Sequence, residues 1–361
     1  MKNRWKNGVA LSLIPQIILV RVIALFPEVV EQYYSQGLFP GIAGFFRTLL
    51  GWIPFSVGDI LYTLLIILGI RYIYKAWGNY WSRPIILLRD VAMVLAIVHF
   101  TFYFSWGLNY FRLPLHQNLK LEKTYDVNAL YAVTQQLVDA TNGLQEQITG
   151  TDSMAVSFPF SKADVYDMTL SGYDALRQEY PSLAYSRPSI KRSLLSTGLS
   201  YMGYGGYLNP FTHEAQVNGK LPKFRYPVVT GHEMGHQLGY SAENEVSFIG
   251  YLATLKNKNI YFQYSAYAYA LGYCLRDLRL RDKEAWDKLR QQINPGVKAN
   301  YQEVTDFWKQ YENPLEPVFK SAFNTFLKAN KQKKGIQSYN QVVALIVNYH
   351  LQYPIGGSGK P

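Results

Sequence analysis

Two histidines and a glutamate with the spacing of a metal centre lie in the second half of the chain. His232, Glu233 and His236 form the pattern H-E-x-x-H. On a helix, residues four apart share one face, so both imidazoles can bind one Zn²⁺, and the glutamate after the first can act as a general base. The pattern therefore predicts a zinc site that activates water. The alternative is that both histidines pack in a core helix without a metal.

A catalytic zinc ion has three protein ligands and one open position for water. Cys274 is the only cysteine, which excludes an intramolecular disulfide and a cysteine-rich zinc cluster. Downstream of the histidines, a helix end is predicted at Gly239, and Ser241 can cap the next helix. That second helix contains the two candidates for the third ligand, Glu243 and Glu245.

The apolar face of the second helix separates these two candidates. Phe248, Ile249 and Leu252 lie three, four and seven residues after Glu245, so this glutamate shares their face. A carboxylate that points into a core is costly unless it is paired or binds a metal. We therefore expect Glu245 to be the third ligand. Glu243 is the alternative ligand, or a residue that holds a ligand histidine by a hydrogen bond.

Three apolar segments precede this site and must position it relative to a membrane. They cover about residues 8–26, 53–70 and 88–106, and each is roughly long enough to cross a bilayer. The first is also compatible with a cleaved signal peptide, but no small-x-small cleavage site follows it and two more apolar segments do. The other alternative is that all three are buried helices of a soluble protein. Charged residues make up only 17% of the chain, against about 25% in a soluble domain, which favours lipid contact.

Basic residues predict the orientation of the three segments. Three precede the first segment, four lie around the second connection, and one lies in the first connection: Lys2, Arg4 and Lys6; Arg71, Lys75, Arg83 and Arg89; Arg47. By the positive-inside rule, the amino terminus and the second connection are cytoplasmic, and everything after residue 111 is extracytoplasmic. Because this topology accounts for the basic residues near the amino terminus, the net charge of +11 does not indicate nucleic-acid binding.

The remaining pattern divides the chain into a membrane domain, residues 1–110, and an extracytoplasmic domain, residues 111–361. In the second domain Asp126, and Ser161 with Asp164, are predicted helix caps. Further helices are expected at residues 263–280, 283–293, 297–311, 315–328 and 339–350. Glycine and proline interrupt residues 180–222, which predicts a small irregular sheet with runs such as 190–196 and 207–211. The expected fold is therefore mainly α with a small β-sheet (α+β).

The zinc segment resembles that of the zincin metallopeptidases, specifically the glutamate-ligand branch (gluzincins). The resemblance rests on residues 232–239 (HEMGHQLG) and on residues 244–247 (NEVS), which match the front of the N-E-x-x-S-type helix that supplies the third ligand. The gap after His236 is shorter than in the best-known members. The three apolar segments, with residues 209–212, 214–218 and 264–267, also resemble a bacterial family of membrane-anchored zincins that is catalogued only as a domain of unknown function. The resemblance supplies no substrate.

The resemblance to zincins implies an edge strand above the metal helix that pairs with the substrate backbone. Residues 203–217 are the best segment for this strand, and a structural glycine-rich turn is the alternative. A tetrahedral intermediate also needs a hydrogen-bond donor for its oxyanion. Tyr264 and Tyr267, on the helix after the metal segment, are candidates for this role, although both also suit packing. His213 and Glu214 lie upstream, and their spacing to His232 does not require a metal contact.

These features together predict a membrane-anchored zinc metallopeptidase that hydrolyses peptide bonds in a protein or peptide substrate. His232, His236 and Glu245 are expected to hold Zn²⁺, and Glu233 to take a proton from water and pass it to the leaving amine. A metal-dependent sensor without turnover is the alternative, but a purely structural metal site has no need of a base such as Glu233. A transporter or channel subunit is less favoured, because residues 111–361 lie outside the three apolar segments.

Overall fold

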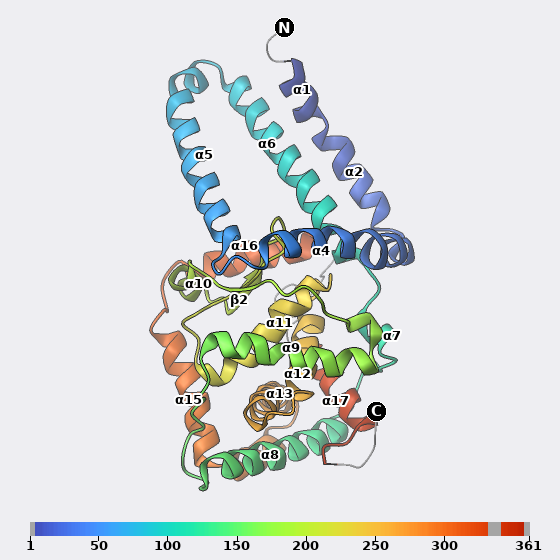
Figure 1. The fold of residues 1–361 in the computed structure, drawn as a ribbon, viewed down its shortest axis with the longest axis vertical. Helices are drawn as coiled ribbons and strands as arrows, with labels where there is room; N and C mark the ends of the chain where they lie inside the picture. The colour runs from blue at the N-terminus through green and yellow to red at the C-terminus, as the bar shows by residue number, and fades with distance from the viewer. Residues whose placement is uncertain (1–3, 331–340, 357–361) are drawn as a thin grey trace.

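A computed structural model of the chain describes residues 4–330 and 341–356. Figure 1 shows its two parts. Three long helices form one end of the molecule, and a mostly helical domain with a small sheet forms the other. The expected combination of many helices with a minor sheet is confirmed.

Three helical segments are long and apolar enough to cross a membrane. The first joins two short helices, and the others lie within single helices: Arg4–Ile23 from α1 (Arg4–Leu11) and α2 (Leu13–Ile23); Val57–Gly78 in α5 (Val57–Ser82); and α6 (Pro84–Ser105). In the most apolar stretch of each segment, only 6%, 11% and 11% of the residues are buried, which argues against core helices of a soluble protein. The three apolar segments are thus confirmed, with shifted boundaries. For example, α5 begins only after Ser56, whose hydroxyl accepts the N–H of Asp59 at 2.9 Å.

The three segments are called spans below. The connection between the first two spans is helical and lies across their ends (Figure 1). It consists of α3 (Pro27–Val29), the π-helical η1 (Val30–Leu38) and α4 (Phe39–Leu50). Glu31 in η1 is buried and accepts two hydrogen bonds from the guanidinium of Arg112, at 2.9 and 2.6 Å. This ion pair with two hydrogen bonds joins the connection to the start of the second domain.

The second domain is built around α13 (Ile260–Arg281), which lies in its centre (Figure 1). The helices packed around it, directly or through one another, are α8 (Val127–Thr149), α9 (Lys162–Glu179), α11 (Tyr226–Gln237), α12 (Glu243–Leu255) and α17 (Val342–Gln352). Their apolar side chains form one large buried cluster. Helix α11 contains the H-E-x-x-H residues and α12 contains the downstream glutamates. Because both helices are buried in this cluster, packing fixes their positions.

Several predicted helix starts are confirmed. Asp126 caps α8 by accepting the N–H of Ala129 at 2.7 Å, and Ser161 with Asp164 forms a reciprocal capping box on α9. The expected late helices are α13, α14 (Lys283–Gln292), α15 (Pro295–Lys309), α16 (Glu316–Ala329) and α17. Residues 339 and 340, expected to begin α17, lie outside the described residues. Short helices complete the domain: η2 (Gly107–Phe111), α7 (Leu115–Asn118), η3 (Pro181–Leu183), α10 (Ser196–Met202) and η4 (Lys223–Arg225).

The sheet has three short strands in the order β1-β3-β2. They are β1 (Ile190–Arg192), β2 (Gly206–Leu208) and β3 (Ala215–Val217). The pair β1 and β3 is parallel, with Ile190 opposite Ala215, whereas β2 runs antiparallel to β3, with Gly206 opposite Val217. The predicted glycine-rich segment 203–217 therefore contains an edge strand, β2, next to α11.

Two buried carboxylates attach the second span to this sheet. Glu214 accepts the N–H groups of Val57 and Gly58, at 3.2 and 2.6 Å, at the N-terminus of α5. A negative charge there is stabilised by the helix dipole and by unpaired N–H groups. Asp59, in the first turn of α5, accepts a hydrogen bond from the hydroxyl of Tyr207 in β2 at 2.5 Å. The edge strand is therefore held directly by the end of a candidate span.

Candidate metal centre

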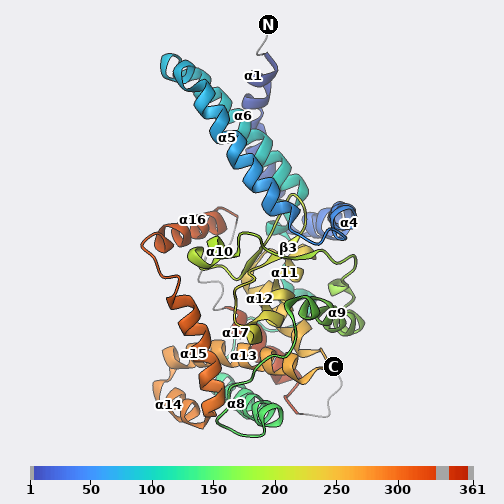
Figure 2. The same cartoon turned by 60° about the vertical axis from the view of Figure 1, so that its left-hand side comes forward.

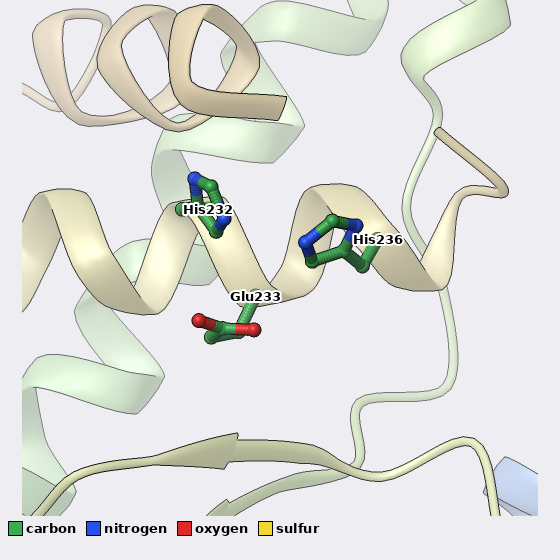
Figure 3. A group of neighbouring side chains, drawn as sticks. All are labelled: His232, Glu233 and His236. Carbon is green, nitrogen blue, oxygen red and sulfur yellow. The ribbon is translucent and has the colours of Figure 1, made fainter. Parts of the chain in front are cut away.

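The H-E-x-x-H residues lie on α11, which ends where Gly239 adopts a φ of +80°. His232, Glu233 and His236 each offer a ligand atom, and these atoms lie within 4.8 Å of one another. Figure 3 shows the Glu233 carboxylate on the side of α11 that faces the strands. The predicted helical placement of the two histidines and the predicted helix end at Gly239 are confirmed.

Hydrogen bonds orient both imidazoles in the same way. The Nδ1 atom of His232 lies 3.2 Å from the hydroxyl of Ser247, and Nδ1 of His236 lies 2.8 Å from the carbonyl oxygen of Tyr240. Each ring therefore uses Nδ1 for a protein partner and directs Nε2 elsewhere. Metal-binding histidines are usually fixed by such a partner on the other nitrogen.

Both Nε2 atoms face Glu243, the first residue of α12. One carboxylate oxygen of Glu243 lies 3.3 Å from Nε2 of His232 and 3.9 Å from Nε2 of His236. Glu243 is itself buried. Two imidazole nitrogens and one carboxylate therefore converge on one small volume.

Glu245, the expected third ligand, faces elsewhere. Its carboxylate accepts the backbone N–H of Leu115 at 2.8 Å. Burial raises the pKa of Glu245, and the nearby charge of Arg112 lowers it by a smaller amount. The helical-face argument does not separate the two glutamates, because α12 is buried on nearly all sides. The residue that directly precedes α12 is Ala242, which has no side-chain cap hydrogen bond, and the hydroxyl of Ser241 donates to the carbonyl of Asn109 at 3.0 Å.

A glycine allows α12 to approach α11 closely enough for this convergence. A Cβ atom at Gly250 would lie 2.6 Å from the backbone nitrogen of His232 and 2.9 Å from the carbonyl oxygen of Val228. Any side chain at this position would push the two helices apart. The separation between Glu243 and the histidines therefore depends on Gly250, which carries no chemistry itself.

The Glu233 carboxylate lies in a buried space between α11 and β2. Its Oε2 atom is buried and has no hydrogen-bond partner among the described residues. Gly206 of β2 lies directly against it, since a Cβ there would be 2.5 Å from Oε1 of Glu233. An unpartnered buried carboxylate is costly, so its presence indicates a group that must remain available.

The electrostatics of the cluster fit a bound cation. Burial raises the pKa of Glu233 to about 8 and lowers that of His236 to about 4. Burial also opposes protonation of His232, but the hydrogen bond with Glu243 and the charges of Glu233 and Glu243 outweigh it and raise that pKa above its ordinary value. Two carboxylates thus share a buried site with one readily protonated imidazole. A divalent ion with nitrogen and oxygen ligands would neutralise them, and this donor set suits zinc.

Tyr264 and Tyr267, the expected oxyanion donors, are not at this cluster. The Tyr264 hydroxyl donates to the side chain of Asn300 at 2.7 Å inside the core. Tyr267 packs against the large apolar cluster, close to Tyr251, whose pKa is raised by burial and, next, by Tyr267. Both are packing residues because α13 crosses the centre of the domain behind α12.

Two other tyrosines, which sequence reasoning did not identify, lie near Glu243. Burial and, next, the charge of Glu243 raise the pKa values of Tyr110 and Tyr204. Tyr204 immediately precedes the glycines of β2, and Tyr110 follows the third span. In a chain with 30 tyrosines no local signal distinguishes these two.

His213 and Glu214, next to the sheet, have structural contacts. Glu214 holds the start of α5, as described above. His213 directs Nε2 to the hydroxyl of Ser105 at 2.8 Å, and its ring lies between Phe39 and Phe46. The expectation that their spacing does not require a metal contact agrees with these positions.

Comparisons with known proteins give a family but no activity. No curated protein and no solved structure matches the chain. One family model, described as a protein of unknown function (DUF3810), matches residues 34–347. Because this match includes the second and third spans, the sheet and the whole metal centre, the chain belongs to the DUF3810 family.

Proposed function

We propose that this protein is a membrane-anchored zinc metallopeptidase with a catalytic domain of the gluzincin type. The observation that carries the proposal is the convergence of both Nε2 atoms on Glu243, beside the buried and unpartnered carboxylate of Glu233. A site that only stabilised the fold would not need a free carboxylate at this position. A buried base next to a metal site supports hydrolysis.

His232, His236 and Glu243 are the residues that would hold the ion. Two histidines and one glutamate are the ligand set of a class of catalytic zinc sites. When bound, Zn²⁺ supplies a Lewis acid that polarises a carbonyl group and makes water more acidic. Ser247 and the carbonyl of Tyr240 keep the two imidazoles in the orientation that this requires.

Glu233 is the proposed general base and acid. Its carboxylate takes the proton of the attacking water as the oxygen bonds to the scissile carbonyl carbon. It then gives the proton to the amide nitrogen, which leaves as an amine when the C–N bond breaks. The unpartnered Oε2 atom supports this role, because no other group among the described residues competes for it.

The edge strand β2 is the proposed guide for the substrate backbone. Within the described part of the chain, β2 pairs with β3 on one side only, and Gly206 brings it against Glu233. An extended peptide that pairs with the other side of β2 would pass directly over the base. Tyr204, two residues before this strand and near Glu243, is the proposed hydrogen-bond donor to the oxyanion.

The catalytic domain is proposed to lie outside the cytoplasm. The basic residues near the amino terminus and around the second connection support this side. The partners implied are the lipid bilayer and a protein or peptide substrate.

The experiment that tests the proposal compares the purified full chain with Glu233→Gln. Both proteins are loaded with zinc in detergent, their metal content is measured, and cleavage of an unbiased peptide library is followed. We expect Glu233→Gln to keep zinc and to lose about 10² to 10⁴ in rate, because the amide preserves shape but cannot accept a proton. Glu284→Gln, on an exposed and distant residue, is the matched control.

Two outcomes would contradict the proposal. Equal cleavage by the wild type and zinc-loaded Glu233→Gln would remove Glu233 from the mechanism. Zinc binding without cleavage by either protein would favour a metal-dependent sensor.

A further inference from the structure

Helix α16 lies at the same level as α4, directly beneath the spans. In Figure 1 both helices run across the ends of the spans, and in Figure 2 they lie on opposite sides of them. Only Leu327 of α16 is buried, so this helix covers the domain without being part of its core.

The C-terminal end of α16 is fixed to two spans. The guanidinium of Arg21, near the end of the first span, donates to the carbonyl of Ala329 at 3.2 Å. The hydroxyl of Tyr103, near the end of the third span, donates to the side chain of Asn330 at 2.7 Å. A cation at a helix C-terminus is favourable, and both contacts hold α16 at the depth where the spans end.

The inner face of α16 contacts the tyrosines of the metal centre. The ring of Phe323 lies 5.5 Å from that of Tyr204, and Phe326 lies 5.7 Å from Tyr110, between ring centroids. These are the two tyrosines close to Glu243. The helix therefore covers one side of the site through aromatic contacts.

A second apolar stripe of α16 faces away from the protein. Leu315, just before the helix, is 60% exposed and Val318 is 61% exposed. Residues 315, 318 and the exposed Ala322 follow helical spacing, so these side chains lie on one face. Lys320 and Lys328 lie outside this stripe and are exposed. A helix with an exposed apolar stripe on one side and lysines on the other has the pattern of a membrane-surface helix.

Helix α4 repeats this pattern on the opposite side of the spans. Phe45, Leu49 and Trp52 are 63%, 52% and 79% exposed along one face of α4 and the residues just after it. A groove of about 470 Å³ along this face is also lined by Arg187. An exposed tryptophan and an arginine next to apolar side chains are typical of the headgroup region of a bilayer.

We infer that α16 and α4 lie in the interfacial layer of the bilayer, that the stripe of Leu315 and Val318 contacts lipid, and that lipid holds α16 over the metal centre. The partner is the phospholipid surface of the leaflet on the side of the catalytic domain. This contact follows from the position of α16 against the spans and does not depend on whether the metal centre hydrolyses peptides.

The test places spin labels on the full chain in nanodiscs of zwitterionic and anionic phospholipid. Leu315→Cys and Val318→Cys report on the stripe, and Cys274 is fully buried, so it does not compete for the label. Leu280→Cys is the matched control, because Leu280 is 75% exposed and lies in the last turn of α13, shortly before α14. Figure 2 shows α14 at the end of the domain away from the spans. The ratio of collision rates with oxygen and with a water-soluble nickel chelate separates lipid from water.

We expect this ratio to be severalfold higher at positions 315 and 318 than at position 280. A ratio at either stripe position no higher than at 280 would overturn the inference, since the stripe would then face water. Because the measurement needs no substrate and no metal, its result is distinguishable from failure of the proposed peptidase activity.

Discussion

The Nε2 atom of His232 lies 3.3 Å from a carboxylate oxygen of Glu243. This contact joins the last half of α11 to the first residue of α12, and Gly250 permits it by letting the two helices touch. It supports the proposal that Glu243 is the acidic residue that completes the histidine pair. Glu245, two residues later, instead fixes the backbone at Leu115.

Replacement of Glu243 by alanine is therefore expected to remove most of the zinc. The loss in affinity should exceed the 10- to 100-fold that is typical of residues that only hydrogen-bond a ligand. Metal content after dialysis against a zinc buffer measures the effect. Glu245→Gln is the comparison, since the amide oxygen still accepts the N–H of Leu115. If Glu245→Gln loses zinc and Glu243→Ala retains it, the ligand set proposed above is wrong.

The orientation of the chain predicts opposite results for two reporter fusions. A periplasmic reporter fused after Trp106 should be active, and one fused after Tyr80 should be inactive, because basic residues are concentrated at the amino terminus and around the second connection. A cytoplasmic reporter at the same points should give the reverse pattern. Activity of the cytoplasmic reporter after Trp106 would place the metal centre inside the cell.

His213 predicts a loss of stability in acid. Burial, and next the charge of Arg47, lowers its pKa from 6.5 to about 3, so below pH 6.5 the unfolded chain binds a proton that the folded chain does not. Its contribution is complete above pH 6.5 and falls as the pH decreases toward 3. Between pH 7.5 and 5 the free energy of unfolding should fall by about 2 kcal/mol from this residue.

Denaturant unfolding of the wild type and His213→Asn at the two pH values isolates this effect. Asparagine suits the φ of +54° at this position, and the comparison cancels other groups, such as His350. The variant should show a smaller decrease in stability by about that amount. An equal decrease in both proteins would show that His213 is protonated in the folded state.

Shortening Phe323 should expose the metal centre. Phe323→Ala removes the ring that packs on Tyr204, so a chelator in solution should withdraw zinc severalfold faster than from the wild type. Thr325→Ala, at an exposed position of the same helix, is the control and should leave the rate unchanged. Identical release rates in all three proteins would mean that the chelator enters by a route that α16 does not cover.

The sequence by itself determined the features that depend on local spacing. The H-E-x-x-H pattern placed two histidines on one face of α11, the capping residues at Asp126 and Ser161 predicted two helix starts, and long apolar runs predicted three spans. Each of these features follows from the helical repeat, a cap or the thickness of a bilayer. No distant residue is needed to specify them.

Only the tertiary structure decided which residues complete the site. The choice between Glu243 and Glu245 depends on how α12 crosses α11, and full burial of α12 removes the pattern that would reveal it. Tyr204 replaces Tyr264 as the candidate donor because β2, and not α13, borders the cluster. Such contacts join residues far apart in the chain, and packing, which has no period in the sequence, brings them together.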